Sequence, residues 1–187
     1  PVHYSLITMK RFLFFIVFVC CLILSGCRHV QYVAVPETHE VYIDRLHRMP
    51  TIIEMPHNDV VQKFIDMYSG RLRRSVSYML AANNFYNPIF EEALETYGVP
   101  HELKYLPVIE SALNPKATSP VGAAGLWQFM LATGKQYGLE VNSLIDERRD
   151  PIKASYAAAR YLKDLYAIFG DWHLVIAAYN CGPGNVT

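Results

Sequence analysis

The stretch from Leu106 to Gln128 constrains the fold of this chain most, because it joins two expected helices through a loop of small residues. Leu103, Leu106, Glu110 and Leu113 recur at spacings of three, four and three, so a helix places Glu110 on a face of leucines. Such a glutamate turns to solvent or pairs with an arginine, or burial raises its pKa so that it can donate a proton. The spacing alone does not decide between these interpretations.

Proline and glycine set the expected limits of the elements in this region. The first helix should begin at Pro100, kink or restart at Pro107, which lacks a backbone donor, and end at Asn114, which precedes a proline. Residues 119–125 are small and turn-forming, which predicts a loop with room for a ligand near its backbone. A second helix is expected over residues 126–137.

The flanking regions carry helical spacing as well, and no run of period two indicates a strand. Asp59, Asp150 and Asp171 are candidate N-caps. The chain is therefore expected to be all-α, with further helices at 59–68, 72–80, 88–97, 151–169 and 172–180.

Composition excludes several classes of function. Lys plus Arg and Asp plus Glu number 17 each, so no excess of basic charge points to a nucleic-acid partner. Of four cysteines, only Cys181 lies beyond the N-terminal region, so no disulfide framework is expected. His101-Glu102 begins like a zinc-protease motif, but Tyr105 stands where the second histidine belongs, so no metal site is expected.

The N-terminal region has the pattern of a bacterial lipoprotein signal peptide. Met9 is a candidate start, and Lys10-Arg11 precede an uncharged apolar run of 13 residues, Phe12–Leu24. That run is shorter than the roughly 20 residues that span a bilayer and suits a signal peptide. It ends in Leu24-Ser25-Gly26-Cys27, which resembles a lipobox and predicts lipidation of Cys27. The alternative is an ordinary anchor helix with an incidental cysteine.

If the lipobox is used, the mature chain begins at Cys27 and acyl chains hold it on a membrane. In the lipoproteins of enteric bacteria an aspartate directly after the lipidated cysteine favours the inner membrane, so by this resemblance Arg28 favours the outer membrane. Residues 28–58 show no helical period and contain three prolines, so they are interpreted as a tether toward the cell wall. The alternative is a flank that packs on the helical domain.

Several ordered motifs resemble the family 1 lytic transglycosylases, which are goose-lysozyme-like enzymes that cleave bacterial peptidoglycan. The likeness covers about residues 72–186 and is strongest to a branch of membrane-bound lipoproteins. The motifs are Glu110-Ser111, Asn114-Pro115-Lys116-Ala117, Ser119 to Gln128, Asp146 to Pro151, Tyr161-Leu162, and Ala178-Tyr179-Asn180 with Gly182 and Gly184.

This resemblance implies that Glu110 is the single catalytic acid and base. It would protonate the oxygen between N-acetylmuramic acid and N-acetylglucosamine and then accept a proton from the muramyl C6 hydroxyl, giving a 1,6-anhydro product without water. A single carboxyl suffices because the nucleophile belongs to the substrate, whereas ordinary glycosidases need two. No cofactor or metal is implied. The residues implied in substrate binding are Ser111, Gln128, Tyr179, Asn180 and Gly125.

The resemblance also implies the architecture, a lysozyme-like helical domain behind a lipoprotein signal peptide. The expected parts are 1–26 with the signal peptide, 27–58 as lipidated tether, 59–98 as N-terminal helices, and 99–187 as the catalytic domain. Family members continue with another helix, and this branch often with LysM modules, so a truncated C-terminus is expected. Leu131 departs from the proline usual in the family.

Peptidoglycan strands are the implied partner, with other cell-wall enzymes as further candidates, and the implied location is the periplasmic face of the outer membrane. Acidic residues at 146, 147 and 150 are expected to cap a helix, and Trp127 is expected in the core. Two other functions stay open, a muramidase of the same fold and a non-catalytic wall-binding lipoprotein.

Overall fold

Helices make up the regular structure of residues 39–186, the part of the chain that the structure, a computed structural model, describes. Only isolated β-bridges occur there, so the expectation of an all-α fold is confirmed. Residues 1–38, which include the predicted signal peptide and Cys27, lie outside the described residues. The helices are α2 (His39–Arg48), α3 (Asp59–Ser69), α4 (Arg73–Tyr97), η1 (His101–Tyr105), α5 (Leu106–Ser111), α6 (Leu131–Gln136), η2 (Glu147–Arg149), α7 (Pro151–Phe169), α8 (Trp172–Cys181) and η3 (Pro183–Asn185).

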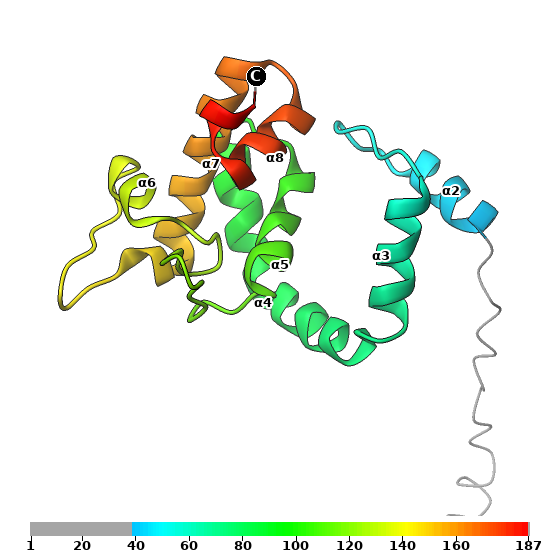
Figure 1. Cartoon of the computed structure of the whole chain (residues 1–187), viewed down its shortest axis with the longest axis horizontal. Coiled ribbons are helices and arrows are strands. Elements are labelled where there is room, and N and C mark those ends of the chain that lie inside the picture. Colours follow the sequence, from blue (N-terminus) through cyan, green and yellow to red (C-terminus); the bar gives the residue numbers. More distant parts are fainter. Residues whose placement is uncertain (1–38, 187) are drawn as a thin grey trace, which may run out of the picture. The chain divides into compact units, whose positions relative to one another are not determined.

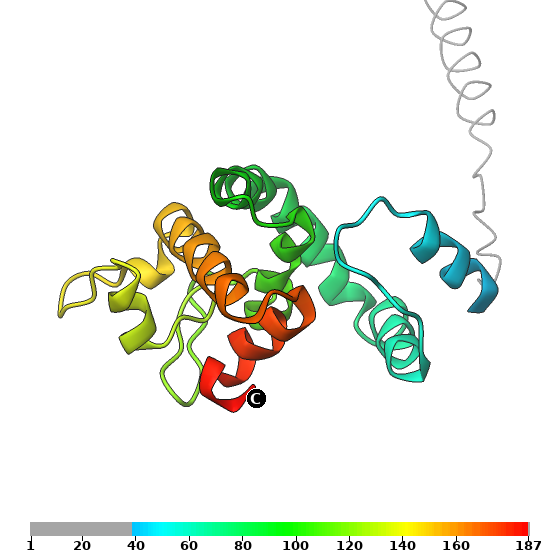
Figure 2. The same ribbon diagram turned by 90° about the horizontal axis from the view of Figure 1, so that it is seen from above.

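The core lies where α4, α7 and α8 pack together (Figure 1). Helix α7 places four alanines on its buried side, at 154, 157, 158 and 159, and none is more than 3% exposed. Small side chains let neighbouring helices approach closely, while Phe90 and Leu94 of α4 fill the space between them. Figure 2 shows α8 turning back beside the end of α7.

The ends of α7 and α8 follow the expected capping pattern. The Asp150 carboxylate accepts hydrogen bonds from the first backbone N–H groups of α7, and Pro151 occupies the first turn. Gly170 ends α7 in the left-handed conformation with φ 64°. Asp171 caps α8, and Gly182 ends it. These boundaries confirm the expectation.

The expected break between helices at 72–80 and 88–97 is wrong, because α4 is continuous and Pro88 lies inside it. A proline inside a helix removes one backbone donor. The buried residues on both sides of it, Met79 before and Phe90 after, pack in the same core and hold both halves of α4 on it. Helix α3 differs less from the expectation, since Asn58 and not Asp59 is its N-cap.

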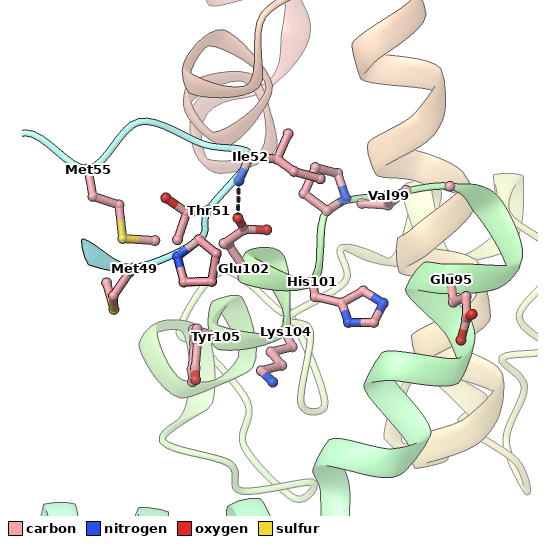
Figure 3. Close-up of a pocket in the computed structure, with 13 residues that line it drawn as sticks. Met49, Thr51, Ile52, Met55, Glu95, Val99, His101, Glu102, Lys104 and Tyr105 are labelled. Atoms are coloured by element: carbon pink, nitrogen blue, oxygen red, sulfur yellow. Dashed lines mark hydrogen bonds between the residues drawn. The ribbon is translucent and has the colours of Figure 1, made fainter. Parts of the chain in front are cut away.

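Residues 28–58 were expected to contain no helix, and this is wrong for α2. Residues 49–58, here called the strap, connect α2 to α3 and lie against the helical domain (Figure 3). Ile53 is 6% exposed and belongs to the core, and the backbone N–H of Ile52 donates to Glu102 Oε1 at 2.5 Å. The strap thus agrees with the alternative of a packed flank.

In the part of the chain that the structure describes, none of the helices combines the length and the apolar character that crossing a membrane requires.

Candidate active site

Helix α5 positions Glu110 in its last turn. Pro107 lies in the first turn of α5, directly after η1, so the expected restart at this proline is confirmed. The helix ends at Ser111 and not at Asn114, because Ala112 and Leu113 adopt left-handed backbone conformations with φ of 50° and 61°. The change of direction still buries Leu113, which is 1% exposed.

The surroundings of Glu110 favour a protonated carboxyl. Leu103 and Leu106 are buried, as the spacing predicted, and Glu110 itself is partly buried. Burial raises the pKa of the Glu110 carboxyl above its ordinary value of 4.5. Within residues 39–186, neither an arginine nor any other side chain forms an ion pair or a hydrogen bond with it. The structure therefore supports the proton-donor interpretation over that of a paired or fully solvated glutamate.

Residues 125–128 form a turn, here called the site turn, where a helix was expected to begin. The backbone is left-handed at Gly125, with φ 83°, and at Gln128, with φ 48°, and an antiparallel bridge joins Ala124 to Phe129. Two left-handed residues within four positions are incompatible with a right-handed helix. The expected helix at 126–137 is accordingly wrong in its first five residues, and α6 begins at Leu131.

Trp127 is the buried anchor of the site turn, and its expected place in the core is confirmed. It is 0% exposed, and its indole N–H donates to Ser155 Oγ at 2.9 Å. Its ring packs edge-on against Phe90 with the centroids 5.3 Å apart. The turn is thereby fixed to both α4 and α7.

Two carbonyl groups of the site turn bind hydroxyls from the helices on either side. Ser111 Oγ donates to the Leu126 carbonyl at 3.0 Å, and the Tyr179 hydroxyl donates to the Trp127 carbonyl at 2.7 Å. Burial, and then the charge of Glu110, raise the pKa of the Tyr179 hydroxyl well above its ordinary value. Tyr179 is one of the residues implied in substrate binding, and in this structure its hydroxyl holds the site turn.

A pocket of about 240 Å³ brings together three of the predicted substrate-binding residues, Gln128, Tyr179 and Asn180. Gln128 Nε2 donates to the Gly125 carbonyl at 2.8 Å, and Asn180 is exposed on α8. Glu110, Ser111 and Gly125 are not among the residues that line this pocket. The other lining residues are Phe129, Met130, Thr133, Tyr161, Cys181 and Gly182.

A larger pocket of about 610 Å³ lies between the strap and residues 98–105 (Figure 3). Its walls include Met49, Met55 and Tyr105, and none of the predicted site residues lines it. Size alone therefore does not identify the reactive site of this domain.

Gly125 was expected to give a ligand close access to the backbone, but in the structure it packs against the backbone carbonyl of Arg148. A Cβ atom there would lie 1.8 Å from the carbonyl oxygen of Arg148. Arg148 lies in the motif from Asp146 to Pro151 but was not among the predicted site residues. Its side chain is nearly buried, with the residue 8% exposed.

Two acidic residues of this motif, Asp146 and Asp150, cap helices as expected, whereas the expectation of capping is wrong for Glu147. Asp150 caps α7, Asp146 accepts from the backbone N–H of Arg148, and Glu147 pairs with Lys153. Among the described residues, no group of three or more His, Cys, Asp or Glu side chains could hold a metal ion.

The fold and the site together define a lysozyme-like helical domain built around one partly buried glutamate. The sequence model of the family described as the transglycosylase SLT domain matches residues 87–187, more than half of the chain. The chain belongs to this family.

Two sequence relatives, both lytic murein transglycosylases, agree with this assignment. The chain is 46% identical over 90 residues to the membrane-bound lytic murein transglycosylase D of Escherichia coli K12, covering 48% of this chain and 20% of that protein. It is 36% identical over 109 residues to the soluble lytic murein transglycosylase of the same strain, covering 54% and 17%. The crystal structure of the 70 kDa soluble lytic transglycosylase from Escherichia coli aligns with 34% identity and a TM-score of 0.47, over 54% of this chain and 17% of that one. The chain thus spans about a fifth of the length of these relatives.

Proposed function

We propose that this chain is a peptidoglycan lytic transglycosylase that cleaves the bond between N-acetylmuramic acid and N-acetylglucosamine. The observation that carries the proposal is the position of Glu110, a partly buried carboxyl with a raised pKa next to the site turn and Tyr179. Family membership and the names of its relatives, lytic murein transglycosylases, support the same substrate class.

The reaction needs one group that first donates and then accepts a proton. Glu110 donates its proton to the glycosidic oxygen as the bond from that oxygen to the muramyl C1 breaks. The muramyl C6 hydroxyl oxygen then bonds to C1, and its proton passes to the Glu110 carboxylate. The products are a 1,6-anhydromuramyl end and a free N-acetylglucosamine 4-hydroxyl. Atoms and charge balance without water, and Glu110 ends protonated as it began.

The contacts of the acidic residues at 146 and 150 agree with a scheme that uses one carboxyl. Glycosidases that use water or a covalent intermediate need a second acidic residue within about 10 Å of the first. Asp146 is paired with Arg148 and Asp150 caps α7. Tyr179 holds the site turn, while Gln128 and Asn180 line the pocket proposed for the sugar and its N-acetyl group.

Mass spectrometry of digested peptidoglycan tests the proposal. A transglycosylase releases muropeptides that are one water lighter than those of a hydrolase. Reducing ends would identify a muramidase instead, and no release at all would identify a wall-binding protein. Glu110→Gln is the matched control, since it keeps the shape of the side chain and removes the proton donor.

The proposed location is the cell envelope, with lipidated Cys27 as the anchor in the outer membrane, facing the periplasm. The lipobox-like sequence before Cys27 and the membrane-bound relative support this proposal. Cys27→Ser should move the protein from the membrane fraction to the soluble fraction, and an unchanged distribution would argue for the anchor-helix alternative.

A further inference from the structure

We propose that Arg148 and Asp146 are positioning residues that set the geometry of the site turn and, through it, of Tyr179 and Glu110. The inference rests on the proposed function and assigns a task to a charged cluster that does not touch the substrate pocket. It follows from the contacts of two consecutive arginines with the loop that precedes α6.

The Arg148 guanidinium donates hydrogen bonds both to the Asp146 carboxylate and to backbone carbonyls of the loop. Its Nε and Nη2 atoms donate to the two Asp146 carboxylate oxygens, each at 2.8 Å. Its Nη1 atom donates to the carbonyls of Gly122 at 2.9 Å and Phe129 at 3.1 Å. A bidentate pair fixes the plane of a guanidinium, so the third nitrogen has a defined direction. The two carbonyls flank the site turn on both sides.

Arg149 holds the beginning of the same loop. Its Nη1 atom donates to the Lys116 carbonyl at 2.8 Å, and Nη2 donates to Thr118 Oγ1 at 2.7 Å. Its Nε atom lies 3.4 Å from the second oxygen of Asp146. Asp146 is therefore shared by both arginines, and residues 116–129 fold around the pair.

The backbone of Arg148 contacts the loop as closely as its side chain does. Gly125 lies against the Arg148 carbonyl with no room for a Cβ atom. The loop is thus fixed to η2 at Gly122, Gly125 and Phe129, and the carbonyls that receive the Ser111 and Tyr179 hydroxyls lie between these points. A shift of the turn would move both hydroxyls and the groups beside them.

This arrangement explains why a cation is buried here. A buried guanidinium is unfavourable unless its donors are paired. Among the described residues, the Arg148 guanidinium donates to Asp146 and to two loop carbonyls. A hydrophobic side chain of similar length would fill the space, but it would give the loop no directed contacts. Catalytic groups displaced by about 1 Å can lose about a hundredfold in rate, so the directed contacts bear on catalysis.

The test compares Arg148→Lys with the unsubstituted full chain and with Arg74→Lys, a matched change at an exposed position of α4. Lysine keeps the positive charge but lacks the planar guanidinium, whose N–H donors point in fixed directions. We expect Arg148→Lys to lower kcat on a muramyl glycan oligomer by about tenfold or more, with KM changed less than about threefold. Arg74→Lys should match the unsubstituted chain.

A double-mutant cycle with Tyr179→Phe separates positioning from general destabilisation. If Arg148 acts through the bond between Trp127 and Tyr179, the loss of kcat on Arg148→Lys should largely disappear in the Tyr179→Phe background. Additive losses, or an unchanged kcat in a folded Arg148→Lys protein, would overturn the inference. If Arg148→Lys does not fold, Asp146→Asn, which keeps the arginine, takes its place with the same readouts.

Amide hydrogen exchange gives a readout that needs no activity. The backbone N–H groups of Ala124 and Phe129 bond across the site turn, at 3.0 and 3.1 Å, and should exchange at least about tenfold faster in Arg148→Lys while those of α3 do not change. Unchanged exchange at the turn would contradict the positioning role. If the unsubstituted chain releases no anhydro product, the proposed function fails, and the exchange result still decides whether Arg148 holds the turn.

Discussion

The Tyr179 hydroxyl donates a 2.7 Å hydrogen bond to the Trp127 backbone carbonyl and so joins α8 to the turn beside α5. The two residues are 52 positions apart in the chain. Ser111 of α5 donates to the adjacent Leu126 carbonyl at 3.0 Å, and burial, followed by the charge of Glu110, raises the pKa of the Tyr179 hydroxyl. Hydrogen bonds thus connect α5, the site turn and α8, which are distant in sequence.

Replacing Tyr179 with phenylalanine should weaken both the fold and the reaction. The substitution leaves the Trp127 carbonyl without its donor, which should lower the free energy of unfolding by about 1 kcal/mol. We expect kcat to fall on the order of tenfold, since the turn is then held less firmly. Urea unfolding and glycan cleavage measure the two effects. Tyr166→Phe is the control, because no described residue hydrogen-bonds to its hydroxyl, and equal effects of the two changes would contradict the assignment.

Substitutions at two glycines of the loop distinguish the cost of a left-handed backbone conformation from the cost of a steric clash. Both are left-handed, with φ of 83° at Gly125 and 87° at Gly122, but only at Gly125 would a Cβ atom meet the backbone, 1.8 Å from the Arg148 carbonyl. Gly122→Ala should cost about 1 kcal/mol for its conformation, and Gly125→Ala should cost at least about 2 kcal/mol more, because the loop must move. Thermal unfolding of both variants checks this, and similar losses would show that the close approach is not needed.

The strap offers a test of where the folded domain begins. Ile53 is 6% exposed and its neighbour Ile52 is 74% exposed. Ile53→Ala should therefore lower the free energy of unfolding by about 2–4 kcal/mol, while Ile52→Ala should change it by less than about 0.5 kcal/mol. If denaturant unfolding finds both substitutions neutral, residues 49–58 behave as the tether that the sequence suggested.

Protonation of Asp146 should contribute to the loss of folding stability of the domain at low pH. The hydrogen bonds from Arg148 hold the pKa of the Asp146 carboxyl below its ordinary value of 3.8. The folded state therefore binds this proton less readily than the unfolded state, so the stabilisation is present above about pH 4 and is lost as the pH falls through the folded pKa. The difference in stability between the unsubstituted chain and Asp146→Asn should narrow from pH 7 to pH 2. A difference that stays constant over this range would contradict the linkage.

The helix ends that local residues determine were predictable. Asp150 with Pro151, Asp171 and Gly170 set the ends of α7 and α8 through contacts within a few residues. The burial of Leu103, Leu106 and Leu113 was predictable from their spacing, although only Leu106 shares α5 with Glu110.

The site turn and the continuity of α4 were not predictable from local pattern. Gln128 is left-handed although it is not a glycine, and contacts with Arg148, some twenty residues later in the chain, hold the turn that contains it. Pro88 indicated a helix start, yet packing on both sides of it keeps α4 whole. In each case tertiary contacts override a local preference.

Glu110→Gln replaces the carboxyl with a neutral amide of the same shape, so its stability and activity can be compared with those of the unsubstituted chain. Because burial raises the pKa of this carboxyl, its contribution to stability is present at low pH and lost as the pH rises through the folded pKa. Glu110→Gln should therefore be at least as stable as the unsubstituted chain at pH 8, while glycan cleavage falls by at least about a hundredfold. Circular dichroism and product release measure both effects, and loss of helical signal in the variant would make Glu110 a structural residue.

The central claim, that burial in the folded domain holds the pKa of the Glu110 carboxyl above its ordinary value, is tested most directly by titration of that one carboxyl. Carbon-13 NMR of a chain labelled at glutamate, with Glu110→Gln used to assign the resonance, follows its protonation across pH. The account predicts a midpoint above the ordinary value of 4.5. A midpoint at or below 4.5 would contradict it.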